Sequence, residues 1–522
     1  AEDMPYRFNW NAPVVSSPHD PSVIYHAANK VLRTSDRGVT WEEISPDLTR
    51  NELEKQGPGG GPITNEGAGG EVYNTILYLV ESSHEAGTIW VGTDDGLVQL
   101  TRDGGATWAD VTPPGLPESM INAIEVSPHD PSTAYIAVTR YKFGDFTPMI
   151  YATSDYGASW RNLAAGLPEE SFVRVVREDP QRRGLLYAGT ETGLQVSFDD
   201  GGHWQSLQLD LPVVPITDLA IRHNDLVAAT QGRAFWILDD LTPLQQLTDE
   251  VIAAGNHLFA PRAAYRLGGG GFGGPGGGGG GQNPPDGAAF HYLLAEELAP
   301  DAEQALELEI LDSEGHLLRR VSSRPDAAGG PPGAGPQGPP KGLPTKAGMN
   351  RYVWDLRRDD LVEVKGLLSF GGMSGPLVPP GTYEARLTLG DTVMTQPVTV
   401  VEDPRSEARP GEYAEQQEMI LAIADRLDEI HQTVLDMREI KAQVEGLLPR
   451  TASHPAAEDL EAAGTAVVEA INALEAELVQ AKTQNFQDII NYPNQLNMDY
   501  MWLMGAVDGA APPINQGSRR AF

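Results

Sequence analysis

An eight-residue unit, TSDRGVTW at residues 34–41, decides how this chain folds because it returns three times. The later copies are TRDGGATW at residues 101–108, TSDYGASW at 153–160 and SFDDGGHW at 197–204. All four fit the pattern S/T-x-D-x-G-x-x-W, and we call this unit the repeat turn. In such a turn the Asp carboxylate accepts backbone N–H groups, Gly takes the positive φ that closes a hairpin, and Trp forms an apolar plug.

Each repeat turn supplies three residues with a predicted structural role, an Asp, a Gly and a Trp. They are Asp36, Gly38, Trp41, Asp103, Gly105, Trp108, Asp155, Gly157, Trp160, Asp199, Gly201 and Trp204. Four equivalent positions cannot share one active site, so we interpret these carboxylates as structural.

The spacing of the repeat turns predicts a β-propeller. Their Asp residues lie 67, 52 and 44 positions apart, and short β-rich runs fill the intervals. Repeats of about 40–50 residues with several short strands are typical of propeller blades. A second phrase, SPHDPS, occurs at residues 17–22 and 127–132, and its repetition favours a loop-capping role for His19 and His129. A degenerate fifth unit follows at residues 216–239.

After the repeats the spacing of apolar residues changes twice, first to alternation and then to helical steps, so we predict a mainly β multidomain protein. A propeller of about five blades at 1–260 precedes a Gly-rich linker or loop at 261–288. Alternating apolar residues then indicate an immunoglobulin- or fibronectin-like β-sandwich at 289–403, with a disordered insertion at 326–343. Apolar residues at three- and four-residue steps predict a helical hairpin plus a short third helix at 404–522, with a long intermolecular coiled coil as the rival.

Composition narrows the possible partners. The formal net charge of -36 disfavours nucleic acid, because the chain would repel a phosphate backbone. There is no Cys, which excludes disulfides, thiolate metal sites and a cysteine nucleophile. The sequence contains no run of 18 apolar residues, so we expect no transmembrane segment.

Several phrases resemble a known family. The repeat turns are similar to the Asp-box (BNR) repeats of sialidases, sortilin-type propellers and two-propeller xyloglucanases. RFNW at 7–10, SPDLT at 45–49, WVGTDDG at 90–96 and GRAFWILDD at 232–240 resemble bacterial sortilin-like Asp-box proteins labelled "glycosyl hydrolase". The resemblance implies the C-terminal portion of such a protein, with its propeller completed by an upstream segment or another chain. It also implies export to an extracellular or periplasmic location.

Candidate site residues fall into two chemical classes. Glycoside hydrolysis needs two carboxylates facing one sugar ring, and the candidates are Glu71, Asp94, Asp95 and Asp218. Arg174 and Arg233 are candidates for binding an anion or a sugar. No metal-ligand motif and no cofactor motif is present, although acidic loops would suit weakly held Ca²⁺.

Two functions therefore stay open. The first is an exported scaffold that binds a protein or peptide, which is what the resemblance to sortilin-type domains implies. The second is a glycoside hydrolase acting on a polysaccharide, like the two-propeller xyloglucanases. A pair of facing carboxylates in the propeller channel would favour the hydrolase, whereas an apolar or Arg-lined channel would favour binding. The acidic helical hairpin could also dock the chain into a larger assembly.

Overall fold

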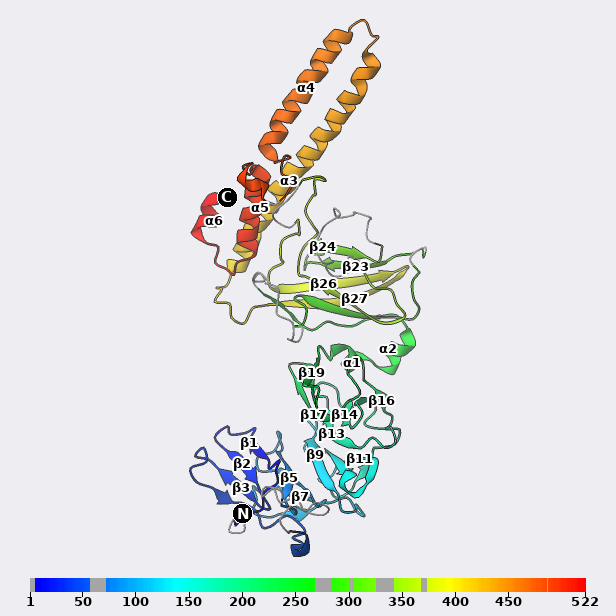
Figure 1. Ribbon diagram of the computed structural model, residues 1–522, viewed down its shortest axis with the longest axis vertical. Helices are drawn as coiled ribbons and strands as arrows, with labels where there is room; N and C mark the ends of the chain where they lie inside the picture. Colours follow the sequence, from blue (N-terminus) through cyan, green and yellow to red (C-terminus); the bar gives the residue numbers. More distant parts are fainter. Residues whose placement is uncertain are drawn as a thin grey trace. The chain divides into compact units, whose positions relative to one another are not determined.

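The chain divides into two units, Ala1–Leu241 and Thr242–Phe522, in the computed structural model of the protein. The structure describes residues 5–56, 72–267, 283–299, 302, 304–324, 342–367, 373–485 and 487–522. Figure 1 draws the first unit from blue to green and the second from green to red.

The first unit is a series of antiparallel sheets that follow one another along the chain, as propeller blades do (Figure 1). Four sheets have four strands in sequence order and the fifth has three. The first two blades contain β1 (Val14–Ser16), β2 (Ile24–Ala27), β3 (Val31–Thr34), β4 (Glu42–Glu43), β5 (Ile76–Glu81), β6 (Ile89–Thr93), β7 (Val98–Thr101) and β8 (Ala109–Asp110). The others contain β9 (Met120–Val126), β10 (Ala134–Arg140), β11 (Asp145–Thr153), β12 (Arg161–Asn162), β13 (Val173–Glu178), β14 (Leu186–Thr190), β15 (Leu194–Ser197), β16 (Gln205–Ser206), β17 (Ile216–Arg222), β18 (Asp225–Thr230) and β19 (Phe235–Leu238). Short 3-10 helices lie at Leu53–Lys55 and Tyr141–Phe143.

The first strands of successive blades contact one another, β5 with β9, β9 with β13 and β13 with β17. They therefore lie on the inner side of the series, where a propeller has its axis. Buried apolar side chains from adjoining blades pack together between them, for example Trp90 with Ile121 and Ile136. A single blade would leave these apolar side chains in water, so each blade is stabilised by its neighbours.

The second unit begins with two short helices, α1 (Thr242–Gln246) and α2 (Asp249–Ala254), and continues with two sheets. One sheet has the order β20-β22-β25 and the other β21-β27-β26-β23-β24. Their strands are β20 (His257–Leu258), β21 (Ala264–Arg266), β22 (Ala288–Leu294), β23 (Leu306–Leu311), β24 (Leu317–Ser322), β25 (Gly348–Trp354), β26 (Gly381–Leu389) and β27 (Thr392–Glu402).

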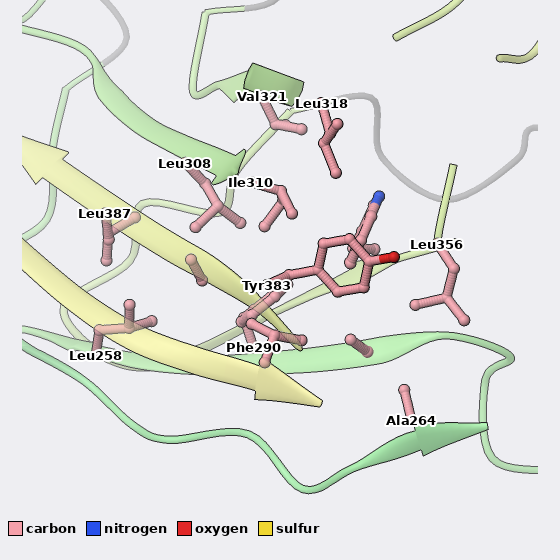
Figure 2. Packing of buried hydrophobic residues seen from close by; sticks show 14 of the residues in the cluster. Leu258, Ala264, Phe290, Leu308, Ile310, Leu318, Val321, Leu356, Tyr383 and Leu387 are labelled. Carbon is pink, nitrogen blue, oxygen red and sulfur yellow. The ribbon is translucent and has the colours of Figure 1, made fainter. Parts of the chain in front are cut away.

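The two sheets share one apolar core (Figure 2). Phe290 of the smaller sheet and Leu308, Tyr383 and Leu387 of the larger sheet all belong to it. Trp354 is fully buried there, and its indole N–H donates to the Arg357 carbonyl at 2.7 Å. The alternating pattern of β23, with Leu inside and Glu outside, produces this arrangement.

The helical segment packs against these sheets. It comprises α3 (Glu412–Leu447), α4 (Ala457–Leu478), α5 (Leu496–Asp508) and α6 (Gln516–Ala521), with 3-10 turns at Leu448–Thr451 and Asp488–Ile490. Asp508 accepts hydrogen bonds from Arg357 Nη1 at 2.6 Å and from the Leu377 backbone N–H at 3.0 Å. Buried Arg266 reaches Gln416 of α3 at 3.1 Å. Polar contacts thus fasten α3 and α5 to the sheets.

The structure confirms a mainly β chain with a C-terminal helical segment, but several boundaries differ from those predicted. The first unit ends at Leu241 and not at 260, because β20 pairs with β22 of the second unit. Within the 261–288 stretch, β21 pairs with β27 in the larger sheet. Leu343, placed in the predicted insertion, is buried in the sheet core. Most of both Gly-rich stretches falls outside the described residues.

Helices α3 and α4 lie antiparallel and pack against each other as a hairpin within the chain (Figure 1). Helix α3 stops at Leu447, directly before the Leu448–Thr451 turn that contains Pro449. No helix in the described part of the chain is long and apolar enough to cross a membrane.

Candidate functional site

The repeat turns hold their own hairpins together. In the first, Asp36 accepts the Thr40 backbone N–H at 2.9 Å and the Thr40 hydroxyl at 2.6 Å, while the Thr34 hydroxyl accepts the Gly38 N–H. The other three turns repeat this pattern around Asp103, Asp155 and Asp199. Hydrogen bonds from Thr40 and Thr34 lower the pKa of Asp36 to about 2, so the carboxylate stays ionised as an acceptor.

The Trp of each later repeat turn joins two blades. The indole N–H donates to a backbone carbonyl of the preceding blade, from Trp108 to Ile44 at 2.9 Å and from Trp204 to Leu163 at 2.8 Å. Trp160 does the same to Val111 at 2.8 Å. These tryptophans therefore connect neighbouring blades and do not form a surface on which a sugar could stack.

His side chains make the reciprocal contact. His19 Nε2 lies 2.7 Å from the Ser82 carbonyl of the second blade, and His129 Nε2 lies 2.7 Å from the Asp179 carbonyl of the fourth. His84 makes the same contact to the Ser127 carbonyl at 2.9 Å. The sequence reasoning missed His84, although Ser82 and His84 align with the Ser and His of SPHDPS.

The predicted site residues that the structure describes lie in or beside the first strands and the turns between second and third strands. The repeat turns join third strands to fourth strands, which places them at the opposite end of each antiparallel blade. Asp94 and Asp95 follow β6, and Arg233 lies between β18 and β19, whereas Arg174 lies near the start of β13. Glu71 falls outside the described residues.

Asp94 and Asp95 are buried, and both carboxylates accept hydrogen bonds from other residues of the first unit. Asp94 accepts hydrogen bonds from the Thr75 backbone N–H at 2.8 Å and from the Thr75 hydroxyl at 2.7 Å. Asp95 accepts from Asn74 Nδ2 at 2.6 Å and from the Arg50 N–H at 2.9 Å. Burial raises the pKa of Asp94 to about 7 against these hydrogen bonds, which lower it. Because these partners all belong to the first unit itself, both carboxylates tie its loops together.

Arg174 is also held by its own unit. Its guanidinium bonds Glu191 at 2.8 Å and lies over the Phe172 ring, with 5.0 Å between the guanidinium carbon and the ring centroid. The Tyr141 ring stacks on Phe172 at 5.2 Å between centroids. Arg174 therefore stabilises an aromatic cluster between the third and fourth blades.

A charged cluster that sequence reasoning missed lies on the first strands, and Arg177 of β13 is its centre. Its Nη2 donates to Asp218 of β17 at 2.8 Å and to the Tyr78 hydroxyl of β5 at 3.1 Å, and its Nη1 lies 3.5 Å from Glu125 of β9. Its Nε donates to the Leu219 carbonyl at 2.9 Å. One guanidinium thus reaches the first strands of four blades.

The electrostatics of this cluster follow from burial. Burial raises the pKa of Glu125 to about 7, while nearby Arg177 lowers it. Asp218, a predicted catalytic candidate, is solvent-exposed but paired with Arg177. In the described part of the unit the inner strands thus carry an Arg between two carboxylates, not a free facing pair. Aligning the first strands would have revealed two charged residues, Glu125 and Arg177, at one repeat position.

The fifth blade exposes apolar side chains. Its third strand, β19, has Phe235 74% exposed, and Trp236 and Ile237 are exposed as well. By contrast, all four residues of β15, the third strand of the fourth blade, are buried. Arg233, just before β19, is exposed, and its guanidinium donates to the neighbouring Gly232 carbonyl at 2.9 Å.

No group of three or more His, Asp or Glu side chains suited to a metal occurs among the described residues.

Comparisons with known proteins find sequence similarity across about a quarter of this chain and weak structural similarity to several solved proteins. No family model matches the chain. The photosystem II assembly lipoprotein Ycf48 of Synechococcus sp. (strain CC9902) is 30% identical over 125 residues, which are 24% of this chain and 35% of Ycf48. This chain thus spans about a third of the length of that curated relative.

Two solved structures illustrate the range of similar propellers. A GH74 xyloglucanase from Xanthomonas campestris is 19% identical with a TM-score of 0.35, covering 46% of this chain and 38% of that one. A structure described as YCF48 bound to D1 peptide is 18% identical with a TM-score of 0.29, covering 42% and 62%. Both neighbours are β-propeller proteins, one a glycoside hydrolase and one with a bound peptide.

Proposed function

We propose that this chain is an exported propeller scaffold that binds proteins or peptides, and that the open strand β19 is a binding site for an extended segment. The observation that carries the proposal is the fifth blade, which among the described residues has three strands where the other four blades have four. An edge strand offers unpaired backbone groups that an extended peptide can bind by strand addition.

The complete blades indicate what would lie there. In the fourth blade the Leu207 N–H donates to the Leu194 carbonyl of β15, which fastens the fourth strand. Thr190 bonds Gly193 in that blade as Thr230 bonds Ala234 in the fifth, so Phe235 corresponds to Leu194. Because paired residues alternate along a strand, the N–H and C=O groups of Phe235 and Ile237 point away from β18.

Side chains around this edge add chemical preference. Exposed Phe235 and Ile237 share one face of the strand and favour apolar residues on the incoming segment. Arg233 just before the strand would favour a carboxylate nearby. The proposed ligand is therefore an extended peptide with apolar residues and an acidic group.

A synthetic peptide with the sequence of residues 204–211, which includes the fourth strand of the fourth blade, is a suitable probe. We expect saturable binding of the fluorescently labelled peptide. Ile237→Pro, which removes an outward N–H, and Phe235→Glu should each weaken binding at least about tenfold. Val213→Glu, a matched change at another exposed apolar residue, should not. Absence of binding, or equal loss in the Val213 variant, would overturn the proposed site.

A second docking surface is proposed at the other end of the series. Trp41 is 43% exposed, and its indole makes no inter-blade hydrogen bond to the described residues, unlike those of its three counterparts. A further blade supplied by an upstream segment or another chain would give Trp41 the carbonyl that its counterparts have. Photo-crosslinking from position 41 in the native host tests this, and crosslinks to solvent-exposed bystanders alone would contradict it.

The alternative function is a glycoside hydrolase. It is supported by the exposed carboxylate of Asp218 on an inner strand, but Arg177 neutralises that group here. Hydrolysis of a polysaccharide panel that disappears in Asp218→Asn or Glu71→Gln would put the hydrolase first. In either function the two-sheet region, predicted to be immunoglobulin- or fibronectin-like, serves as a spacer or interaction module. Export is tested by fractionating host cells, and a cytosolic protein would contradict it.

A further inference from the structure

Helix α4 carries two stripes of apolar residues at heptad spacing, which we call seams. Among the described residues, only one of them is packed against another helix. Gly464, Ile471 and Leu478 recur every seven residues on the side that faces α3. Ile471 is buried there, and a Cβ added to Gly464 would lie 2.8 Å from Leu448 Cδ2, so this seam is closely packed. A helix that needs only one partner has no reason to repeat a second apolar seam.

The second seam repeats with the same period on the exposed side. Leu460, Val467 and Leu474 are seven residues apart, and Ala463 and Ala470 lie between them at heptad spacing. All five are exposed. Small alanines between larger apolar residues allow another helix to approach closely.

Helix α3 extends this second seam. Ile440 follows seam residue Met437 by three positions, just as Val467 follows Gly464 and Leu474 follows Ile471. Each of these residues is therefore rotated by the same angle about its helix axis from the α3–α4 contact. In two antiparallel helices, equal rotations in this sense lead to the same side of the pair. Arg438 bonds Glu475 at 2.7 Å, which sets Ile440 level with Leu474. Leu447, seven residues after Ile440, is then level with Val467.

Five exposed side chains therefore form one surface, which we call the hairpin face: Ile440, Leu447, Leu460, Val467 and Leu474. Their exposed fractions lie between 38% and 56%. Single exposed apolar residues are ordinary, but a contiguous stripe at heptad spacing is typical of a surface that binds another helix.

The charge around the hairpin face indicates which kind of partner it binds. Helix α4 contains six acidic residues and no Lys or Arg. Asp459 and Glu477 lie on the flank of the hairpin face, both are exposed, and neither forms an ion pair within the described part of the chain. Asp436 is exposed on the same side of α3, one turn before Ile440. A second copy of this hairpin would bring like charges together, whereas a basic helix would neutralise them.

We propose that the hairpin face binds a cationic amphipathic helix of a partner protein, whose apolar stripe packs on the five side chains and whose Lys or Arg residues pair with the flanking carboxylates. This interaction is independent of the strand-addition site on β19. The helix-in-groove mode supplies apolar affinity, and the flanking charges supply selectivity.

The test uses the full chain and two synthetic helical peptides of four heptads. Both have Leu at the a and d positions, and their e and g positions are Lys in one and Glu in the other. Fluorescence polarisation should show saturable binding of the Lys peptide that weakens with added salt, and at least about tenfold weaker binding of the Glu peptide. Val467→Glu with Leu474→Glu should abolish Lys-peptide binding.

Two matched variants keep the result interpretable. Ala462→Glu with Thr465→Glu makes the same change on exposed positions of α4 outside the hairpin face, and should bind like the parent. Asp459→Lys with Glu477→Lys retains the apolar stripe and should reverse the preference between the peptides. Circular dichroism verifies that each variant keeps its helices.

Three outcomes overturn the proposal. The first is equal binding of both peptides, and the second is equal loss in the Ala462 and Val467 variants. The third is a concentration-dependent dimer in sedimentation that the Val467 and Leu474 substitutions dissociate, because a second copy would then occupy the hairpin face.

Discussion

The inter-blade tryptophans allow a prediction with an internal control, because one copy of the same residue in the same turn lacks the contact. Trp204 is 8% exposed and donates to the Leu163 carbonyl at 2.8 Å, whereas Trp41 is 43% exposed and has no such bond to the residues that the structure describes. Trp204→Phe removes the indole N–H and leaves a buried carbonyl unpaired, which costs about 1–3 kcal/mol. The smaller ring adds a cavity cost of about 1 kcal/mol.

The expected loss for Trp204→Phe is therefore about 2–4 kcal/mol, and that for Trp41→Phe is within about 0.5 kcal/mol. For a unit of this size the first loss lowers the unfolding temperature by about 4–16 °C. Scanning calorimetry of the full chain resolves this if the transition of the first unit is assigned first, since two units need not unfold together.

The reasoning about blade contacts would be refuted if the two variants lost equal stability, or if Trp204→Phe were neutral.

The same unit allows three more predictions. Gly105→Ala should cost at least about 2 kcal/mol more than Gly38→Ala in urea unfolding, because both have positive φ but only the Gly105 Cβ would meet the Ile44 carbonyl oxygen, at 2.4 Å. Equal costs would refute the inter-blade explanation. The unfolding temperature should be highest near about pH 4.5, since Asp36, with its pKa lowered to about 2, loses its stabilising contribution as pH falls through about 4 to 2. Glu125 and Asp94, each with its pKa raised to about 7, make folding less favourable as pH rises from about 4.5 to 7, and a shallower fall in Glu125→Gln over that range would confirm the part of Glu125. Arg177→Met should destabilise the unit by at least about 2 kcal/mol at neutral pH and by less near pH 5, where Glu125 is protonated; a pH-independent loss would contradict the pairing.

The sequence predicted those parts of the fold whose signals are local. Each repeat turn carries its own Asp, Gly and Trp, so the hairpins between third and fourth strands could be located from eight residues. The apolar steps along residues 420–447 likewise identify a long helix. Such elements are specified by neighbours in the chain, and periodicity detects them.

Features that depend on distant pairing were not predictable in this way. The two-residue strand at His257–Leu258 has no pattern of its own and is defined only by its partner β22. The Arg177 cluster assembles residues from four strands, with Tyr78 and Arg177 nearly a hundred positions apart. Asp94 and Asp95 are catalytic candidates by their place in a turn, but the turn pattern does not encode the distant contacts that bury both side chains.

The reciprocal Trp and His contacts have a consequence for how the blades open. Each Trp and His contact joins a blade only to the next one, so, apart from the Arg177 cluster that also links the second blade to the fourth, the first unit resembles a linear array with nearest-neighbour coupling. Opening should then begin at the first and fifth blades, each of which contacts one other blade among the described residues through these Trp and His groups, and spread inward. Amide hydrogen exchange would show this as a gradient, slowest in β10 of the middle blade and fastest in β2 and β18. A ligand strand bound along β19 should slow amide exchange mainly in the fifth blade. Opening of the bound protein would then begin at the first blade.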